Sequence, residues 1–252
     1  MAAFRIEIAG AVFAVRSLFE STRDYCKNYL TEKEPDFSVE VFPEDLVFEQ
    51  NALDEEAKEE GMKRRKFTDP FLERTAIQRK VADHLLSRDT LLYHGSGIAL
   101  DGEGFLFTAA CGTGKSTHTE LWSSRFTGQG GTRYRATVIN GDKPLVRRAP
   151  DGRFWAYGTP WCGKEGKGVN RRCPLNAICF LEQGADNRVT VASTADAAAR
   201  IMEATVLPPD AEGQDRMAAL VGATVRDIPA LTLSCRPDME AVEVAYEFLS
   251  RI

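Results

Sequence analysis

The chain of 252 residues is 43% hydrophobic and 27% charged, which are ordinary proportions for a folded protein with a buried core. Its net charge of −5 and its pI near 5.4 argue against a general nucleic-acid binder, which would carry a basic excess. No apolar run is long enough to cross a membrane, and the start of the chain lacks a signal-peptide pattern. We therefore expect a cytoplasmic protein, in which the six cysteines are reduced thiols.

The first third of the chain predicts an α+β segment. Its charged stretch, residues 44–66, predicts either a surface helix or a mobile excursion. The next helix is expected to start at Asp69 and Pro70, because an N-cap residue followed by proline is a helix-start signal. We expect residues 1–92 to be an N-terminal lead-in that packs on the main domain. The other elements expected here are strands over residues 4–8 and 37–42 and helices over residues 18–29 and 69–87.

From residue 94 onward the pattern becomes β-rich. Turn signals at residues 101–104 and 149–152 each separate two apolar stretches and predict hairpins. A third turn makes residues 188–191 the expected hairpin partner of a strand at residues 175–181. This pattern departs from strict strand–helix alternation, so we expect an α/β fold with a mixed β-sheet flanked by helices. The expected strands are 97–100, 105–108, 136–139, 144–148, 153–157, 175–181, 188–191 and 230–235, and the expected tail helices are 195–205, 214–225 and 239–249.

Residues 109–117, Ala-Ala-Cys-Gly-Thr-Gly-Lys-Ser-Thr, match a phosphate-binding loop (P-loop). They follow a predicted strand and precede a predicted helix, which is the context that the motif requires. Glycines let backbone N–H groups turn toward a polyphosphate, and the helix N-terminus favours negative charge. In this motif the lysine reaches the outer phosphates and the serine hydroxyl binds Mg²⁺. The usual first glycine is replaced by Ala109. The expected nucleotide-binding residues are Cys111, Gly112, Thr113, Gly114, Lys115, Ser116 and Thr117.

Two further segments carry candidate site residues. Asp142 follows an apolar strand and lies 27 residues after Lys115, where a P-loop fold places the carboxylate that binds Mg²⁺. Residues 157–168 are rich in glycine and contain two lysines, so this loop can close over an anionic substrate. Trp161 in the same loop fits either a lid over a nucleotide base or a hydrophobic anchor. Weaker candidates for phosphate or substrate binding are Lys143, Lys164, Arg171 and Arg172.

Taken in this order, the motifs resemble the family of HPr kinase/phosphorylase and ATP-dependent phosphoenolpyruvate carboxykinase, and its small kinase-like branch in particular. In that family a hairpin with a His-Gly pair leads into the P-loop, and an Asp-Asp pair ends a later strand. The resemblance spans roughly residues 94–181, with a weaker match at 230–249. Besides the P-loop, the matching stretches are Tyr93-His94-Gly95, Ile139-Asn140-Gly141-Asp142-Lys143-Pro144, 158–164 and 174–182.

The resemblance implies catalytic roles for three residues, His94, Lys115 and Asp142. Mg²⁺ would be held by Ser116 and Asp142, with His94 near the transferring phosphoryl group. Gly141 departs from the family, because relatives carry there the first of two acids, a candidate general base. We expect an acid restored at this position to lie beside Asp142 and His94. In its absence His94 can accept the proton, or it can be a structural histidine.

Together these features predict an ATP- and Mg²⁺-dependent kinase that phosphorylates a hydroxyl group of a small molecule or of a serine-containing peptide or protein. The resemblance assigns this activity to an HPr-kinase-like domain over residues 93–252. The partners are then a nucleotide and a hydroxyl-bearing substrate, with no nucleic acid and no membrane. Gly141 favours an alternative, a nucleotide-binding regulatory module without turnover.

Overall fold

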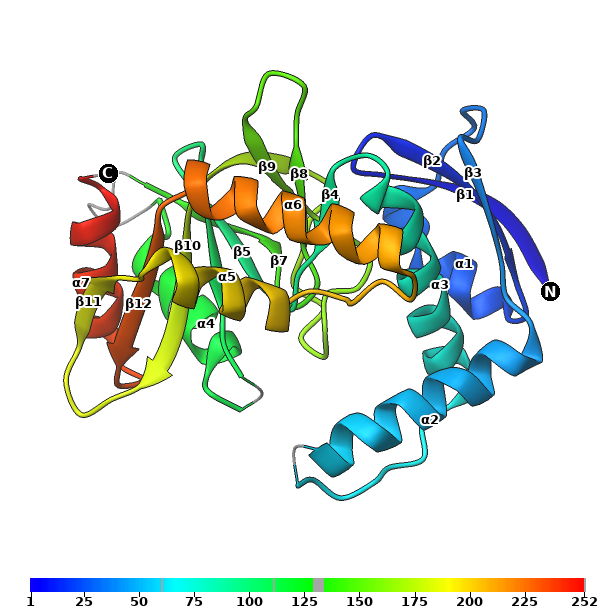
Figure 1. Cartoon of the computed structure of the whole chain (residues 1–252), viewed down its shortest axis with the longest axis horizontal. Helices are drawn as coiled ribbons and strands as arrows, with labels where there is room; N and C mark the ends of the chain where they lie inside the picture. Colours follow the sequence, from blue (N-terminus) through cyan, green and yellow to red (C-terminus); the bar gives the residue numbers. More distant parts are fainter. Residues whose placement is uncertain (60, 111, 129–133, 252) are drawn as a thin grey trace. The chain divides into compact units, whose positions relative to one another are not determined.

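The computed structural model describes residues 1–59, 61–110, 112–128 and 134–251, which form a mixed α/β protein whose sheets are flanked by helices (Figure 1). The expected fold class is therefore confirmed. The chain divides into two compact units, Met1–Leu85 and Leu86–Ile252. The functional boundary that we expect between residues 92 and 93 stays a prediction.

Two expectations drawn from composition concern membranes and thiols. Of the described helices, none combines the length and the apolar content that crossing a bilayer needs. The cysteines at positions 26, 162, 173, 179 and 235 are free thiols. Cys111 lies outside the described residues.

The first unit is built on a three-stranded sheet. β1 (Ala2–Ile8) pairs antiparallel with β2 (Ala11–Ser17), and β2 pairs in parallel with β3 (Phe37–Glu40). The two outer strands were predicted, whereas β2 was missed. Ala9 and Gly10 form the β1–β2 turn with φ of 50° and 73°. Alanine seldom takes this left-handed conformation, so the sequence offers only half of the usual hairpin signal.

The helix expected over residues 18–29 is wrong in its extent. The structure has a short helix, α1 (Glu20–Tyr25), followed by a 3₁₀ turn (Lys27–Tyr29). The buried carboxylate of Glu73 accepts hydrogen bonds from the N–H groups of Leu18 and Phe19, which holds the chain before α1 in a non-helical conformation. The other helices of this unit are α2 (Pro43–Glu59) and α3 (Asp69–Leu86).

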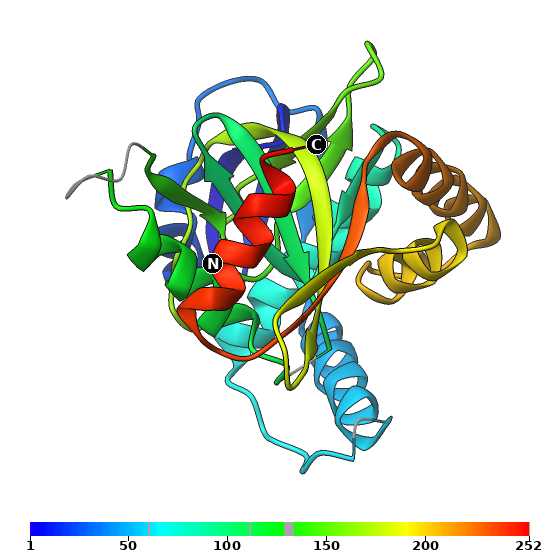
Figure 2. The same ribbon diagram turned by 90° about the vertical axis from the view of Figure 1, so that its left-hand side faces the viewer.

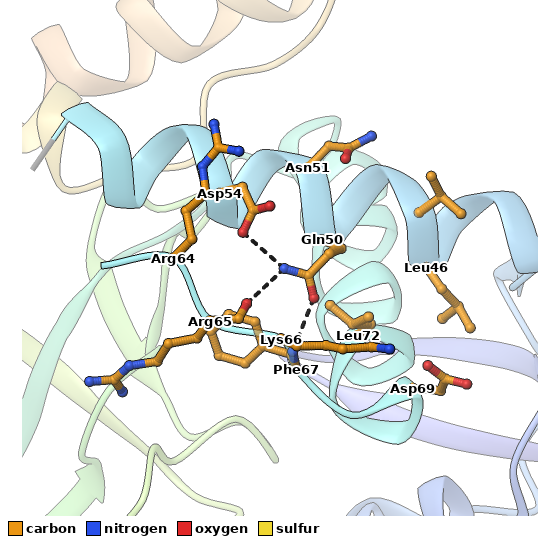
Figure 3. Close-up of a pocket in the computed structure, with 11 residues that line it drawn as sticks. Leu46, Gln50, Asn51, Asp54, Arg64, Arg65, Lys66, Phe67, Asp69 and Leu72 are labelled. Carbon is orange, nitrogen blue, oxygen red and sulfur yellow. Dashed lines mark hydrogen bonds between the residues drawn. The ribbon is translucent and has the colours of Figure 1, made fainter. Parts of the chain in front are cut away.

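A pocket of about 450 Å³ lies in the first unit and is lined by residues of α2, of the segment 64–67 and of the start of α3. Gln50 on α2 ties this segment to the helix (Figure 3). Its amide nitrogen donates to Asp54 Oδ1 at 3.0 Å and to the Arg65 carbonyl at 2.9 Å. Its amide oxygen accepts from Phe67 N at 3.0 Å. The side chain of Gln50 thus holds the irregular segment between α2 and α3 against α2.

The second unit contains a nine-stranded mixed sheet. Its strands are β4 (Thr90–Leu92), β5 (Gly95–Leu100), β6 (Glu103–Thr108), β7 (Ala136–Asn140), β8 (Leu145–Arg148), β9 (Phe154–Tyr157), β10 (Arg172–Gln183), β11 (Arg188–Val191) and β12 (Ala230–Cys235). The main path is β4-β8-β9-β10-β6-β5-β7, and β12 pairs with both β10 and β11. β10 pairs antiparallel with β9 but in parallel with β6 and β12. The antiparallel pairs β5–β6 and β8–β9 confirm the two predicted hairpins.

The predicted hairpin between β10 and β11 is wrong. β12 lies between these two strands, parallel to β10 and antiparallel to β11. Leu231 and Leu233 of β12 are buried, and both edges of this strand are paired. β11 is largely exposed and suits the outer edge of the sheet. A local turn signal cannot reveal a strand that returns from far along the chain to take the central place.

Helices cover both faces of this sheet, so the second unit has three layers (Figure 2). The helices are α4 (Lys115–Arg125), α5 (Thr194–Glu203), α6 (Ala211–Asp227) and α7 (Met239–Leu249). Successive residues of β10 point to opposite faces. Ile178 and Phe180 pack with α5 and α6, whereas Cys179 and Leu181 pack with α4 and α7. The predicted P-loop therefore leads into a helix that is packed against the sheet.

Candidate functional site

The P-loop motif lies between β6 and α4, in the context that the sequence predicts. β6 ends at Thr108 and α4 begins at Lys115. Gly112 and Gly114 have φ of 74° and 115°, a left-handed conformation that favours glycine. Gly114 also caps α4, so the loop ends at a helix N-terminus, where free N–H groups attract an anion. Cys111, predicted as part of this loop, lies outside the described residues.

The side chain of Lys115 lies back over the loop that precedes it. Its Nζ donates to the carbonyl oxygen of Ala109 at 2.7 Å and to that of Ala110 at 3.3 Å. The ammonium group is thus held at the loop, where phosphate oxygens can replace these two carbonyls as stronger, charged acceptors. Ser116 and Thr117 follow in the first turn of α4, and both are exposed.

Aromatic packing fixes α4 beneath the loop. Trp122 is fully buried and its indole nitrogen donates to His118 Nε2 at 2.9 Å. Burial lowers the pKa of His118 to about 4, so this imidazole is neutral near pH 7 and can accept that hydrogen bond. Trp122 therefore belongs to the core that holds α4 against the sheet.

Asn140, for which the sequence pattern predicts no role, organises the turn that carries Asp142. Its side chain is fully buried at the end of β7. Its oxygen accepts from the backbone N–H groups of Asp142 at 2.8 Å and Lys143 at 2.7 Å. Its nitrogen donates to the carbonyl of Thr159 at 3.1 Å and to the hydroxyl of the same residue at 2.9 Å. One amide group therefore joins the Asp142 turn to the glycine-rich loop.

His94 and Asp142 lie side by side. The Gly95 N–H donates to the Asp142 carbonyl at 2.9 Å, and His94 Nε2 lies 3.5 Å from Asp142 Oδ1. The backbone of His94 is fixed by two more contacts, since its N–H donates to the Ala204 carbonyl at 2.6 Å and its carbonyl accepts from Thr108 Oγ1 at 2.8 Å. His94 lies in the link between β4 and β5, next to the end of β6. These strands therefore hold His94 beside Asp142, the acid predicted to bind the metal.

The local charges shift the pKa values of both groups. Burial, and to a smaller extent the positive charges of Lys143 and Lys115, lower the pKa of His94 to about 3. Burial raises the pKa of Asp142, while those two lysines oppose the rise and the negative charge of Glu165 adds to it. His94 is therefore neutral near pH 7, and its contact with Asp142 is not an ion pair.

The glycine-rich loop has a buried half and an exposed half. Thr159, Trp161 and Cys162 are buried, and the Thr159 hydroxyl donates to the Lys143 carbonyl at 2.8 Å. Trp161 is thus placed as a hydrophobic anchor, which leaves little of it to serve as a lid. Residues 163–166 are exposed. The predicted closure over an anionic substrate remains a prediction and concerns this exposed half.

Gly141 makes room for this loop. Its N–H donates to the Lys167 carbonyl at 2.9 Å. A side-chain Cβ at this position would lie 3.2 Å from that carbonyl oxygen and 3.4 Å from the carbonyl oxygen of Cys162. A side chain at position 141 would therefore need the loop backbone to give way by a few tenths of an ångström. That an acid there would lie beside Asp142 and His94 stays a prediction.

The weaker cationic candidates occupy different places. The charge of Lys143 acts on both His94 and Asp142, so this lysine belongs to the site region. Lys164 and Arg171 are exposed. The guanidinium of Arg172 stacks 4.4 Å from the ring centre of Trp155 and donates to the Tyr157 hydroxyl at 3.3 Å. A role in substrate binding stays a prediction for Lys164, Arg171 and Arg172.

The residues predicted to hold Mg²⁺, Ser116 and Asp142, offer oxygen atoms, the donor type that this ion prefers. Across residues 1–59, 61–110, 112–128 and 134–251, no group of three or more His, Cys, Asp and Glu side chains is arranged to hold a metal by itself. Mg²⁺ in nucleotide sites takes one or two protein carboxylates and completes its shell with phosphate oxygens and water. The donor set therefore fits Mg²⁺ that arrives with a nucleotide.

No family model matches the chain, and no curated protein matches its sequence. Among solved structures, the chain is similar to the HPr(Ser) kinase/phosphatase from Coxiella burnetii. The two share 10% sequence identity, and the match covers 64% of this chain and 97% of that chain with a TM-score of 0.37. The likeness is a distant structural relationship.

Proposed function

We propose that the chain is a kinase that transfers the terminal phosphoryl group of ATP, in the presence of Mg²⁺, to a hydroxyl group. The acceptor is a small molecule or a serine-containing peptide or protein. The observation that carries the proposal is the P-loop between β6 and α4, with the charge of Lys115 acting on the adjacent pair of His94 and Asp142. Catalysis of this reaction depends mainly on positioning and charge stabilisation, which these residues can supply.

In the proposed reaction, the acceptor oxygen forms a bond to the terminal phosphorus while the bond to the leaving ADP oxygen breaks. Lys115 balances the phosphate charge. Ser116 and Asp142 would hold Mg²⁺, which would supply further positive charge at the phosphate oxygens. His94 receives the hydroxyl proton, which leaves late in a loose transition state. Burial is the main cause of the low pKa of His94, so this imidazole is neutral near pH 7 and can accept a proton.

A second candidate function is nucleotide binding without turnover. Position 141 favours it, because loop backbone stands where a general-base acid would extend. The two candidates differ in one observable, the formation of ADP.

The test measures ADP formation from ATP and Mg²⁺, alone and with serine-containing peptides or small hydroxyl compounds. Wild type is compared with Lys115→Ala, which removes a charged group that is not part of the hydrophobic core. A kinase forms ADP and phosphorylated acceptor together, and Lys115→Ala loses both by about tenfold or more. Tight ATP binding with no ADP formed with any acceptor would favour the regulatory module. Equal ADP formation by Lys115→Ala would remove the P-loop from the reaction.

A further inference from the structure

The exposed half of the glycine-rich loop brings a carboxylate, Glu165, to the P-loop. Ser116 Oγ, the predicted metal ligand at the start of α4, donates to Glu165 Oε2 at 3.4 Å. Two residues further along the loop, Lys167 Nζ lies 2.7 Å from Glu120 Oε1, also on α4. Two polar contacts therefore lay this segment along the first turns of the helix that would hold the phosphates.

The backbone is shaped to deliver Glu165 to this place. Gly163 and Gly166 flank it with φ of 70° and 60°, a left-handed conformation that favours glycine. Between Gly141 and Lys167 the backbones approach within hydrogen-bond distance, 2.9 Å from N to O. A Cβ at position 141 would lie 3.2 Å from that same carbonyl oxygen, so a glycine there lets the loop take this course without a shift of its backbone. The glycine at position 141 and the position of Glu165 at the P-loop thus depend on the same close approach of two backbone segments.

We propose that Glu165 supplies the second carboxylate of the nucleotide site and, with Ser116 and Asp142, provides an oxygen ligand for the divalent cation of the bound nucleotide. The inference rests on the proposed function. The loop that carries Glu165 also lies against Asp142, because a Cβ at Gly163 would be 3.4 Å from Asp142 Oδ2. A hydroxyl and two carboxylates from three separate segments make an all-oxygen donor set of the kind that Mg²⁺ takes.

A purely structural role for Glu165 makes a different prediction. In that case Glu165 only fastens the loop to α4, as Glu120 does through Lys167. Removing either carboxylate would then have the same small effect on nucleotide and metal binding. Glu120→Gln is therefore the matched control, since it removes the other carboxylate that joins this loop to α4 and leaves Glu165 in place.

The experiment measures ATP affinity of the full chain by calorimetry, once with EDTA and once with Mg²⁺. Binding of Mn²⁺ to the ATP complex, followed by electron paramagnetic resonance, gives a second readout that is independent of turnover. The variants are Glu165→Gln, Glu165→Ala and Glu120→Gln. Both Glu165 variants alter an exposed side chain, so circular dichroism matching that of wild type is expected.

The proposal predicts that both Glu165 variants bind ATP in EDTA at least as tightly as wild type, because a negative charge has been removed. It also predicts that they lose about tenfold or more in Mn²⁺ affinity and in the gain that Mg²⁺ gives to ATP binding. Glu120→Gln stays within about twofold of wild type in every measurement. Metal affinities of the Glu165 variants equal to those of Glu120→Gln would overturn the assignment while leaving the proposed kinase intact. No ATP binding by wild type in either condition would overturn the proposed function and this inference with it.

Discussion

Replacing Asn140 with alanine is the most direct test of how the fold presents Asp142. The amide of Asn140 makes four hydrogen bonds with nitrogen and oxygen atoms, two with the backbone N–H groups of Asp142 and Lys143 and two with Thr159, at distances between 2.7 and 3.1 Å. A fifth, weaker one goes to Cys162 Sγ at 3.5 Å. Because the side chain is fully buried, water cannot reach its position to replace them. The change should therefore both destabilise the second unit and release the Asp142 turn.

The expected loss follows from those contacts. A buried hydrogen bond contributes about 1 kcal/mol net, so the loss of four costs about 4 kcal/mol in the free energy of unfolding. That is a large part of the roughly 5–15 kcal/mol that typical domains have. Thr159→Val removes the hydroxyl that accepts from Asn140 and donates to the Lys143 carbonyl, and it should cost about half as much.

Urea unfolding followed by tryptophan fluorescence measures the effect in the relevant unit, because Trp122, Trp155 and Trp161 all lie in Leu86–Ile252. Asn187→Ala is the control. This amide also donates to two carboxylates and accepts from a backbone N–H group, but it is only half-buried. Its removal should cost about 1 kcal/mol or less, since water can replace the lost contacts. A loss for Asn140→Ala no greater than that for Asn187→Ala would refute the reasoning.

Three further predictions concern the metal, the core histidine and the glycine at position 141. Asp142→Asn should keep ATP affinity in EDTA but lose the gain from Mg²⁺, because an amide is a poorer ligand for this ion than a carboxylate; calorimetry that finds the full gain would place the metal elsewhere. His118 has a folded pKa of about 4, below the usual value near 6.5, so the unfolded chain takes up a proton first as the pH falls, and stability is lost from about pH 6.5 downward. The share of His118 in that loss should be about 2 kcal/mol at pH 5, and it should be absent in His118→Gln. Urea unfolding of both proteins at pH 7 and pH 5 measures the difference; an equal pH dependence in the two proteins would contradict the low pKa of His118. Gly141→Asp should not raise phosphoryl transfer, because its side chain meets the Lys167 carbonyl 3.2 Å from the Cβ position, and Gly141→Ala should disturb the loop in the same way; faster transfer by Gly141→Asp alone would show that the added acid reaches the reacting groups.

Local signals were sufficient for much of the fold. The strand at residues 230–235 and the helix at 239–249 have the limits that their patterns predict. The two predicted hairpins between consecutive strands, β5–β6 and β8–β9, also form. The pairing of β11 was missed because its neighbour β12 comes from a distant part of the chain. Periodicity reports which residues are buried, but not which strand lies beside which.

The site was only partly predictable for a related reason. Motif spacing predicts Lys115 and Asp142 as site residues, because both belong to segments with strong sequence patterns. Asn140 and Glu165 act through loop geometry, and that geometry depends on contacts between residues far apart in sequence, such as Gly141 with Lys167. A signal for Asn140 was present, because Asn followed by Gly after an apolar strand is a turn signature in which the side chain bonds nearby backbone. Glu165 carries no such signal in an exposed, glycine-rich segment.

The central claim is that the loop before α4 binds the phosphates of a nucleotide through Lys115. Calorimetric titration of ATP and Mg²⁺ into wild type and Lys115→Ala measures this binding without requiring that the acceptor be known. The account predicts saturable binding to wild type and a loss of about tenfold or more in Lys115→Ala, with circular dichroism unchanged. Equal ATP affinity of the two folded proteins would contradict it.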